Sequence, residues 1–384
     1  MLLASFVNGI ILQRTLRAMD ESFAAMNRLL DEEYAAPQDD RASGSARSLI
    51  AWSEIGRNGK RFVADGPTWD EIAAVLGREA LPPIRVYAGY GTGDTLEERA
   101  QIALEELERV GGFDRSTLVV ATSTGIGWLD PSAVNPVEFI HGGDIATVTL
   151  QYSYLPSWLT LMVEPEQSRR AAHALFEAVY GHWTTLPRDE RPALYLFGLS
   201  LGALGSEDSA DFITMIADPI GGAVWSGPPF PSRVWRAVTR DRNPGSPQWR
   251  PIFRDSAVIR FMTQDGFPDL AGAEWGPVRI VYLQHASDPM TFFSTDMAWA
   301  RPDWLGADRG RDVSPYLRWF PVVSFLQAAF DIPMATTVPL GYGHSFAPAS
   351  YIDAWIEVTQ PKDWSAADTA KLKAHFLDFN PSPL

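Results

Sequence analysis

The 384-residue sequence contains no cysteine, and its 32 Lys and Arg are outnumbered by 47 Asp and Glu. The lack of cysteine excludes disulfides, thiolate nucleophiles and Cys-ligated metal sites. A formal net charge of −15 repels phosphate backbones, and nucleic-acid binding needs clustered Lys and Arg, so we expect no nucleic-acid partner. The six histidines, together with hydroxyls and carboxylates, remain as candidates for chemistry.

Metal and cofactor motifs are also lacking. The sequence has no H-E-x-x-H motif and no pair of histidines at helical spacing. The loop Gly89–Gly93 (GYGTG) resembles a phosphate-binding loop, but it lacks the Lys of a P-loop and the full dinucleotide fingerprint. We therefore expect no metal and no cofactor, and we interpret this loop as the start of the helix that follows it.

No long hydrophobic run marks a membrane span. The apolar run Met1–Leu12 is shorter than the about 20 residues that cross a bilayer. Arg14 and Arg17 follow it directly, as charged residues follow the end of a membrane helix. Apolar residues spaced by three and four from Leu12 to Leu30 instead predict an ordinary amphipathic helix that packs on the body, a partner or an interface. Both interpretations stay open.

The rest of the chain has the composition of a folded α/β protein. Hydrophobic residues make up 46%, including 14 Trp and 20 Phe. The polar stretch 35–47 predicts a linker, so we divide the chain into an N-terminal helix and linker, 1–47, and one domain, 48–384. Short β-branched runs alternate there with helical stripes, the pattern of a mainly parallel sheet between helices. The strands are expected at 84–88, 117–121, 145–151, 193–197, 223–226, 278–284 and 336–340.

Two segments of this domain are too long for simple connections. They span 229–276 and 299–330, and we expect them to form cap-like excursions over a site.

The strongest motif is Gly198-Leu199-Ser200-Leu201-Gly202, a G-x-S-x-G elbow directly after the expected strand ALYLF. A sharp strand-to-helix turn exposes the serine Oγ, and glycines allow neighbouring backbone to approach it. The bare motif also occurs by chance in glycine-rich sequences, but its position after a buried strand favours Ser200 as a nucleophile.

A serine hydroxyl needs a base and a carboxylate that orients the base. In an α/β-hydrolase order these partners follow the serine, in loops after later strands. Asp288 in QHASDPM and His344 in GYGHS satisfy that order, with Asp218 and Glu207 as reserve acids. We expect His285 to be a strand-end or pocket residue. The other histidines are expected on helices, loops or the surface: His141, His173, His182 and His375.

An oxyanion hole and a pocket complete the predicted site. One donor is expected from the amide of Leu201, and the second from Thr124 or Gly125, in the loop after the strand TLVVA. The sequence His141-Gly142-Gly143 resembles a lipase oxyanion motif. It precedes a strand, whereas the lipase motif follows one, so we interpret it as a tight turn. Aromatic residues are the candidate pocket walls: Trp128, Tyr154, Trp158, Trp225 and Phe292.

Several separate stretches, in order, carry a family resemblance: LVVATSTGIGWLDP, LQYSYLPSW, FGLSLGALGSE, YLQHASDPM and GYGH. From about Ser48 onward the chain resembles bacterial α/β-hydrolases that have an N-terminal multi-span membrane domain and a soluble C-terminal catalytic domain. The resemblance implies the triad Ser200, Asp288 and His344. It also implies association with the bacterial inner membrane, on an unknown side, for a protein whose catalytic part is soluble. That family's elbow has Glu before the serine, where this chain has Leu199, which is expected to change the polarity of the pocket.

The predicted function is therefore a serine hydrolase that cleaves a carboxylic ester through an acyl-enzyme, with an apolar or lipid-like ester as substrate. Three alternatives stay open. An acyltransferase would use the same triad with an alcohol acceptor, a peptidase would cleave amides, and a non-catalytic binding protein would keep the fold alone.

Overall fold

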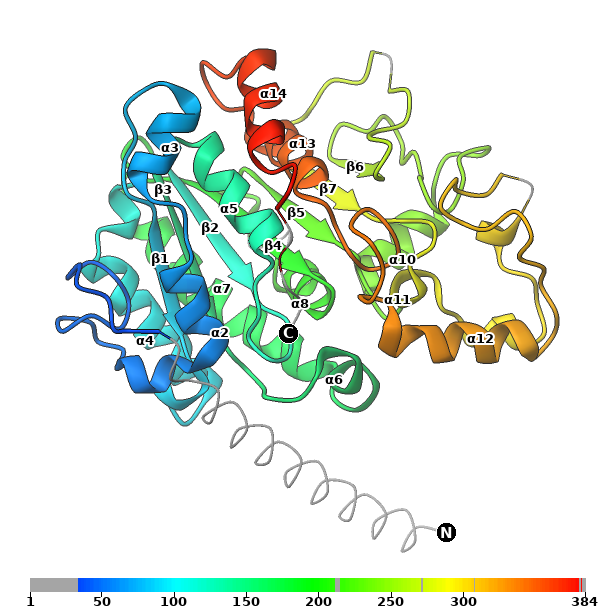
Figure 1. Cartoon of the computed structure of the whole chain (residues 1–384), viewed down its shortest axis with the longest axis horizontal. Coiled ribbons are helices and arrows are strands. Elements are labelled where there is room, and N and C mark those ends of the chain that lie inside the picture. The colour runs from blue at the N-terminus through cyan, green and yellow to red at the C-terminus, as the bar shows by residue number, and fades with distance from the viewer. Residues whose placement is uncertain (1–33, 211–214, 271, 307, 380, 382–384) are drawn as a thin grey trace, which may run out of the picture.

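The computed structural model describes residues 34–210, 215–270, 272–306, 308–379 and 381 (Figure 1). The predicted N-terminal amphipathic helix therefore lies outside the described residues. Within them, no helix combines the length and the apolar composition that a bilayer crossing requires.

The centre of the fold is a parallel sheet of seven strands, in the order β1-β3-β2-β4-β5-β7-β6. Its strands are rich in Val, Ile and Leu and almost wholly buried, as expected for a sheet covered on both faces. They are β1 (Ile84–Ala88), β2 (Thr117–Thr122), β3 (Ile145–Leu150), β4 (Ala193–Leu199), β5 (Gly222–Ser226), β6 (Ile259–Met262) and β7 (Arg279–Leu283).

Helices pack in two groups on this sheet (Figure 1). One group contains α4 (Leu96–Arg109), α7 (Glu166–Thr185) and α8 (Leu201–Ser209), which contact one another in series. The other contains α3 (Trp69–Leu76), α5 (Pro131–Ile140), α13 (Pro348–Thr359) and α14 (Ala366–His375). The remaining α-helices are α2 (Trp52–Ala64), α6 (Ser157–Val163), α10 (Arg233–Arg240), α11 (Pro289–Phe292) and α12 (Val323–Asp331). The short 3-10 helices are η2 (Tyr90–Thr92), η3 (Gly112–Asp114), η4 (Thr295–Ala298), η5 (Asp303–Leu305) and η6 (Ile332–Met334).

Local sequence explains where the main helices begin. Thr95 and Glu98 form the expected capping box at α4, with each side chain accepting a bond from the other residue's backbone N–H. Asp130 caps α5 by accepting a hydrogen bond from the amide of Ser132.

Three expectations differ from the structure. The predicted linker, 35–47, packs on the body: Ser43 and Ser45 are buried, and the Arg109 guanidinium donates to the carbonyl of Asp40 at 2.7 Å. The predicted cap segment 229–276 contains β6, so part of it belongs to the sheet. No strand forms at 336–340: the N–H of Thr337 donates to the carbonyl of Met334 in a turn, and Pro339 has no N–H for a ladder.

The sheet places three loops side by side. Leu199 at the end of β4 pairs with Ser226 of β5, and Ser226 pairs with Leu283 of β7. The carboxyl ends of these strands therefore meet at one edge, where parallel α/β sheets bind ligands.

Candidate active site

Ser200 occupies the turn between β4 and α8, in a backbone conformation that L residues rarely adopt (φ 57°, ψ −123°). Its N–H donates to the carbonyl of Ser226 at 2.9 Å, which fixes the turn against β5. Both flanking glycines are required sterically. A Cβ on Gly198 would lie 2.3 Å from the backbone of Gly202, and a Cβ on Gly202 would lie 2.1 Å from the carbonyl oxygen of Thr122. The strained turn is thus held by close backbone contacts on both sides.

Asp288 and His344 form a buried pair after β7. The Nδ1 of His344 lies 2.7 Å from Oδ2 of Asp288, and the side chains are 5% and 0% exposed. Asp288 also accepts hydrogen bonds from the Met290 amide at 2.8 Å and the Thr291 hydroxyl at 3.0 Å. Burial alone would raise the pKa of Asp288, but the charge of His344 and these hydrogen bonds outweigh it and lower the pKa. The carboxylate is therefore held ionised against the imidazole.

Backbone contacts position the loop that carries His344. The N–H of His344 donates to the carbonyl of Ala335 at 2.9 Å. The N–H of Gly343 donates to Ser287 Oγ at 2.9 Å, and His285 Nδ1 lies 2.9 Å from the carbonyl of Gly343. These hydrogen bonds hold the loop that carries His344 against the loop that carries Asp288.

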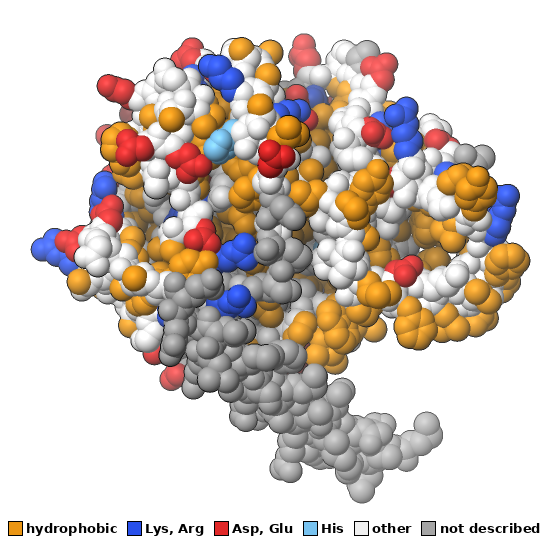
Figure 2. All heavy atoms as spheres, in the orientation of Figure 1, with side chains coloured by type: hydrophobic (Ala, Val, Ile, Leu, Met, Phe, Trp, Pro, Cys, Tyr) orange, Lys and Arg blue, Asp and Glu red, His pale blue; other side chains and the backbone are white. Residues whose placement is uncertain are grey.

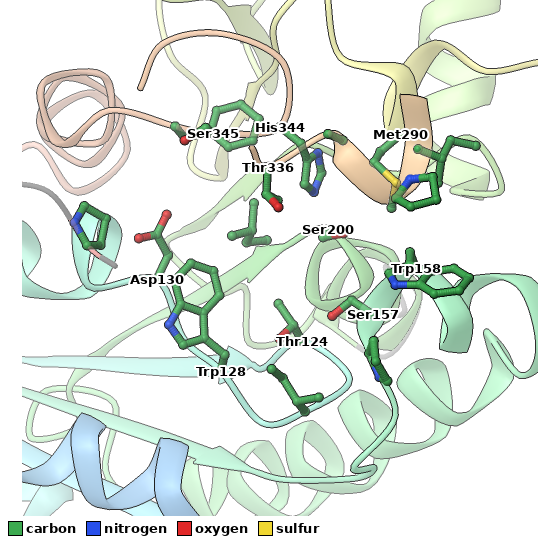
Figure 3. Close-up of a pocket in the computed structure, with 18 of the residues that line it drawn as sticks. Thr124, Trp128, Asp130, Ser157, Trp158, Ser200, Met290, Thr336, His344 and Ser345 are labelled. Atoms are coloured by element: carbon green, nitrogen blue, oxygen red, sulfur yellow. The ribbon is translucent and has the colours of Figure 1, made fainter. Parts of the chain in front are cut away.

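Ser200 and His344 line one cavity of about 210 Å³ (Figure 3). The Nε2 of His344 is buried and has no hydrogen-bond partner among the described residues, so it is free to accept a proton in this cavity. Most of the lining is apolar: Ile126, Trp128, Pro156, Trp158, Leu199, Met290, Ile332, Pro333, Ala335, Leu340, Phe346 and Pro381. The space suits an apolar group next to the serine.

The predicted oxyanion donors lie on two elements, α8 and the loop after β2. Leu201 is the first residue of α8, so its N–H has no partner within the helix. The N–H of Thr124 is not free, because it donates to the carbonyl of Trp128 at 3.0 Å. The Thr124 hydroxyl, in contrast, is buried in the cavity wall without a partner in the described part of the chain. Gly125 does not line the cavity. The loop thus offers a side-chain donor where a backbone donor was expected.

Two of the five predicted pocket aromatics line the cavity, Trp128 and Trp158. The other three do not line it. Trp225 is buried in the core and donates its indole N–H to Ser206 Oγ at 2.9 Å. Phe292 packs edge-on against Trp235, and Tyr154 lies against Tyr90 with ring centroids 4.8 Å apart.

Asp130 is a cavity residue that sequence reasoning missed, since its position before a proline indicates only a helix cap. Its side chain is 3% exposed and lines the cavity (Figure 3). Burial raises its pKa to about 6, although hydrogen bonds from Ser132 and Tyr351 and the charge of His344 act in the opposite direction. The carboxyl group of Asp130 therefore lies in the cavity wall, whereas Asp288 is connected to the cavity through His344.

The reserve acids lie elsewhere. Asp218 pairs with Arg191 at 2.7 Å. Glu207 is buried and accepts hydrogen bonds from the Tyr282 hydroxyl at 2.7 Å and from the amides of Val234 and Trp235 at 3.1 Å. Neither of them lines the cavity.

The remaining histidines lie outside the cavity lining. Those expected at helices or the surface pair with neighbours: His141 with Thr117, His173 with Glu177, His182 with Glu108 and His375 with Glu71. Across the described ranges, no group of three or more His, Asp and Glu could hold a metal ion.

A parallel sheet with a strained serine turn, followed in the chain by an acid and a histidine, defines the α/β-hydrolase class. The sequence comparison agrees. Residues 84–372 match the profile of an alpha/beta-hydrolase family, and residues 1–67 match the profile of an alpha/beta-hydrolase family N-terminus. The chain belongs to this family.

Searches of curated proteins and of solved structures give no relative that indicates an activity. No curated protein matches the chain. A Trichoderma reesei cutinase in complex with a phosphonate inhibitor is 14% identical, over 64% of this chain and 89% of the cutinase, with a TM-score of 0.27. The RedJ thioesterase of the prodiginine pathway in Streptomyces coelicolor is 18% identical, over 44% of this chain and 82% of its own, with a TM-score of 0.22. Similarities this low carry no argument about activity.

Proposed function

We propose that this protein is a serine esterase that hydrolyses carboxylic esters with an apolar acyl group. One observation supports the proposal above all others. The strained Ser200 lines the same cavity as His344, whose Nε2 is free while its Nδ1 is bound to the buried Asp288 at 2.7 Å. This is the arrangement by which an imidazole activates a serine hydroxyl.

In the proposed reaction, His344 Nε2 takes the proton of Ser200 Oγ as the oxygen attacks the ester carbonyl carbon. Asp288 keeps the imidazole in the tautomer with Nδ1 protonated and stabilises the imidazolium that forms. The amide of Leu201 and the hydroxyl of Thr124 donate to the oxyanion of the tetrahedral intermediate. His344 then protonates the leaving alcohol, and the acyl group stays on Ser200.

Deacylation reverses these roles. Water attacks the acyl carbon and gives its proton to His344, the acid product leaves, and Ser200 regains its proton. An apolar acyl group is favoured because most of the side chains around the cavity are apolar. Trp128 and Trp158 are proposed as walls of its binding site.

Covalent labelling tests the nucleophile. A fluorophosphonate probe should modify the wild-type protein at Ser200, as located by peptide mass spectrometry, and should not modify Ser200→Ala. Ser157→Ala is the matched control, because Ser157 also lines the cavity but has no imidazole partner in the proposal. Labelling of Ser200→Ala, or its failure in the wild type, would exclude the proposed chemistry.

Product analysis tests the choice of ester and acceptor. We expect hydrolysis of p-nitrophenyl butyrate but not of the matching p-nitroanilide. If added alcohols capture most of the acyl group as new esters at low millimolar concentration, the protein is an acyltransferase. If the anilide is cleaved at a comparable rate, it is a peptidase.

A further inference from the structure

Large apolar side chains are exposed on two segments that flank the cavity. On α6 these are Trp158 and Met162, which is 61% exposed. On α12 and the turn after it they include Leu326, Phe330, which is 72% exposed, and Met334. With Val323 at the start of α12, these six residues are here called the apolar rim.

The two parts of the rim belong to one opening. Trp158 of α6 lines the cavity on one side, and Ile332 and Pro333, directly after α12, line it on another. Leu161 of α6 and Ile332 also belong to the same small buried cluster, so one apolar cluster supports both segments. Hydrophobic side chains predominate along the lower edge of the molecule in Figure 2, over α6 and α12 of Figure 1.

The rim segments carry almost no charge. Residues 153–163 have no charged side chain, and residues 319–343 have one, Asp331. A surface helix normally has a polar outer face. On α12, however, Phe325 packs inward against Phe293 with ring centroids 5.4 Å apart, while Leu326 and Phe330 are exposed. A patch of this kind at a cavity mouth marks a surface that is covered in function.

We propose that the apolar rim docks on the surface of a lipid aggregate without net charge, and so brings the cavity mouth to the acyl chains. The choice of a lipid rests on the proposed esterase function. The charges argue against an anionic lipid surface. The rim has no Lys or Arg to bind anionic headgroups, and the net charge of −15 of the chain would be repelled by them. A protein partner is less suited, because protein interfaces use a polar border with Arg and about ten hydrogen bonds.

Fluorescence tests the docking itself. Because the chain has no cysteine, Gln327→Cys on α12 gives a single label site for an environment-sensitive dye, here placed in the Ser200→Ala protein so that no lipid is hydrolysed. We expect a blue shift on addition of phosphatidylcholine vesicles, and at least about tenfold weaker binding to pure phosphatidylglycerol vesicles at low salt. The control label is Lys371→Cys on α14, at the opposite edge of Figure 1, and it should not shift.

Three outcomes would overturn the inference. The first is no shift of the α12 label with phosphatidylcholine, or a preference for phosphatidylglycerol. The second is a label that is already blue-shifted without lipid, which would mean that another part of this chain covers the rim. The third is a dimer by sedimentation that hides the α12 label, which would mean that a second copy covers it.

Activity provides the second test. The triple variant Met162→Gln/Leu326→Gln/Phe330→Gln keeps helix propensity while removing the apolar surface. Its rate of hydrolysis of dissolved p-nitrophenyl acetate should be within about twofold of the wild-type rate. Its rate on emulsified p-nitrophenyl palmitate should be at least about tenfold lower than that of the wild type. The control Trp69→Gln/Leu377→Gln removes two exposed apolar side chains outside the rim, on α3 and just after α14, and should lose neither activity.

The two proposals fail in different ways. A wild-type protein that hydrolyses neither ester contradicts the esterase function, and the vesicle experiment then decides on docking alone. Equal losses on both esters in the triple variant would show that the rim supports the cavity structurally, which contradicts docking.

Discussion

Gly227, directly after β5, lies against the imidazole of His344: a Cβ built on Gly227 would stand 2.5 Å from Cε1 and 2.8 Å from Nδ1 of the ring. Gly227 also has φ +50° and donates its N–H to the carbonyl of Leu283 at 2.9 Å, so its backbone is fixed between β5 and β7. The glycine therefore leaves room for the ring at the place where it meets Asp288.

We predict that Gly227→Ala lowers kcat for ester hydrolysis by about 100-fold or more, because the added methyl displaces the imidazole by about 1 Å. Steady-state kinetics with p-nitrophenyl butyrate measures the effect. Gly181→Ala in α7 is the control, since a Cβ there meets no atom within 4 Å. It should keep its activity and unfold at a slightly higher temperature, as helical Ala is about 0.5–1 kcal/mol more favourable than Gly. Unchanged kinetics in Gly227→Ala would mean that His344 is not the base.

A second prediction concerns the carboxylate. Asp288→Asn should keep the fold but lower kcat by about 10⁴-fold, because an amide no longer stabilises the imidazolium or holds Nδ1 protonated. The control is Asp218→Asn, which changes an acid that pairs with Arg191 away from the cavity and should cost less than about twofold. Thermal unfolding of both variants separates a local effect from loss of structure. Equal activities in the two variants would remove Asp288 from the proposed triad.

Much of the fold is predictable because, for most strands, the sequence of the strand shows by itself that it is buried. A buried parallel strand has a short run of β-branched and apolar residues, and six of the seven strands coincide with such runs. β6 was missed because its four residues include the partly buried Arg260, whose guanidinium reaches Glu357 at 3.2 Å. The run 336–340 has β-branched residues too, but it forms a turn in which the N–H of Thr337 donates to the carbonyl of Met334, and Pro339 lacks the N–H that a ladder needs.

The candidate site is likewise only partly predictable from the sequence. Chain order and loop position predict that Ser200, Asp288 and His344 lie together; in the structure Ser200 and His344 line one cavity, and Asp288 is bonded to His344. The pocket walls were harder, because both faces of β5 are buried and nothing local shows that Trp225 points to Ser206 on α8, away from the cavity. Likewise, Asp130 has the local pattern of a helix cap, and only the tertiary fold brings it to the cavity.

The third prediction is a pH dependence of stability. Burial raises the pKa of Glu207 to about 7, against its ordinary 4.5, although hydrogen bonds from Tyr282 and the Trp235 amide act in the opposite direction. A carboxyl whose folded pKa is raised stabilises the fold fully below its unfolded pKa, and that contribution is lost as pH rises past 7. The free energy of unfolding of wild type should therefore fall relative to Glu207→Gln by about 3 kcal/mol between pH 4.5 and 8.5. Urea unfolding of both proteins at the two pH values measures this difference. A constant difference would mean that the fold does not raise the pKa of Glu207.

The last prediction assigns the second oxyanion donor. The amide of Thr124 is bonded to Trp128, but its hydroxyl is buried in the cavity wall without a partner in the described chain. Thr124→Val should therefore lower kcat by about 10²–10³-fold with little change in KM, because the bond forms only in the transition state. Thr124→Ser, which keeps a hydroxyl, should recover most of the rate.

Thr149 on β3 is a matched control, since its hydroxyl is equally buried and unpartnered within the described residues but does not line the cavity. Thr149→Val should leave kcat unchanged and should not destabilise the fold, since it removes an unpaired polar group. A Thr124→Val protein with wild-type kcat would assign the oxyanion to backbone donors alone. A Thr124→Ser protein as slow as Thr124→Val would indicate that the threonine methyl, through packing, is what the site requires.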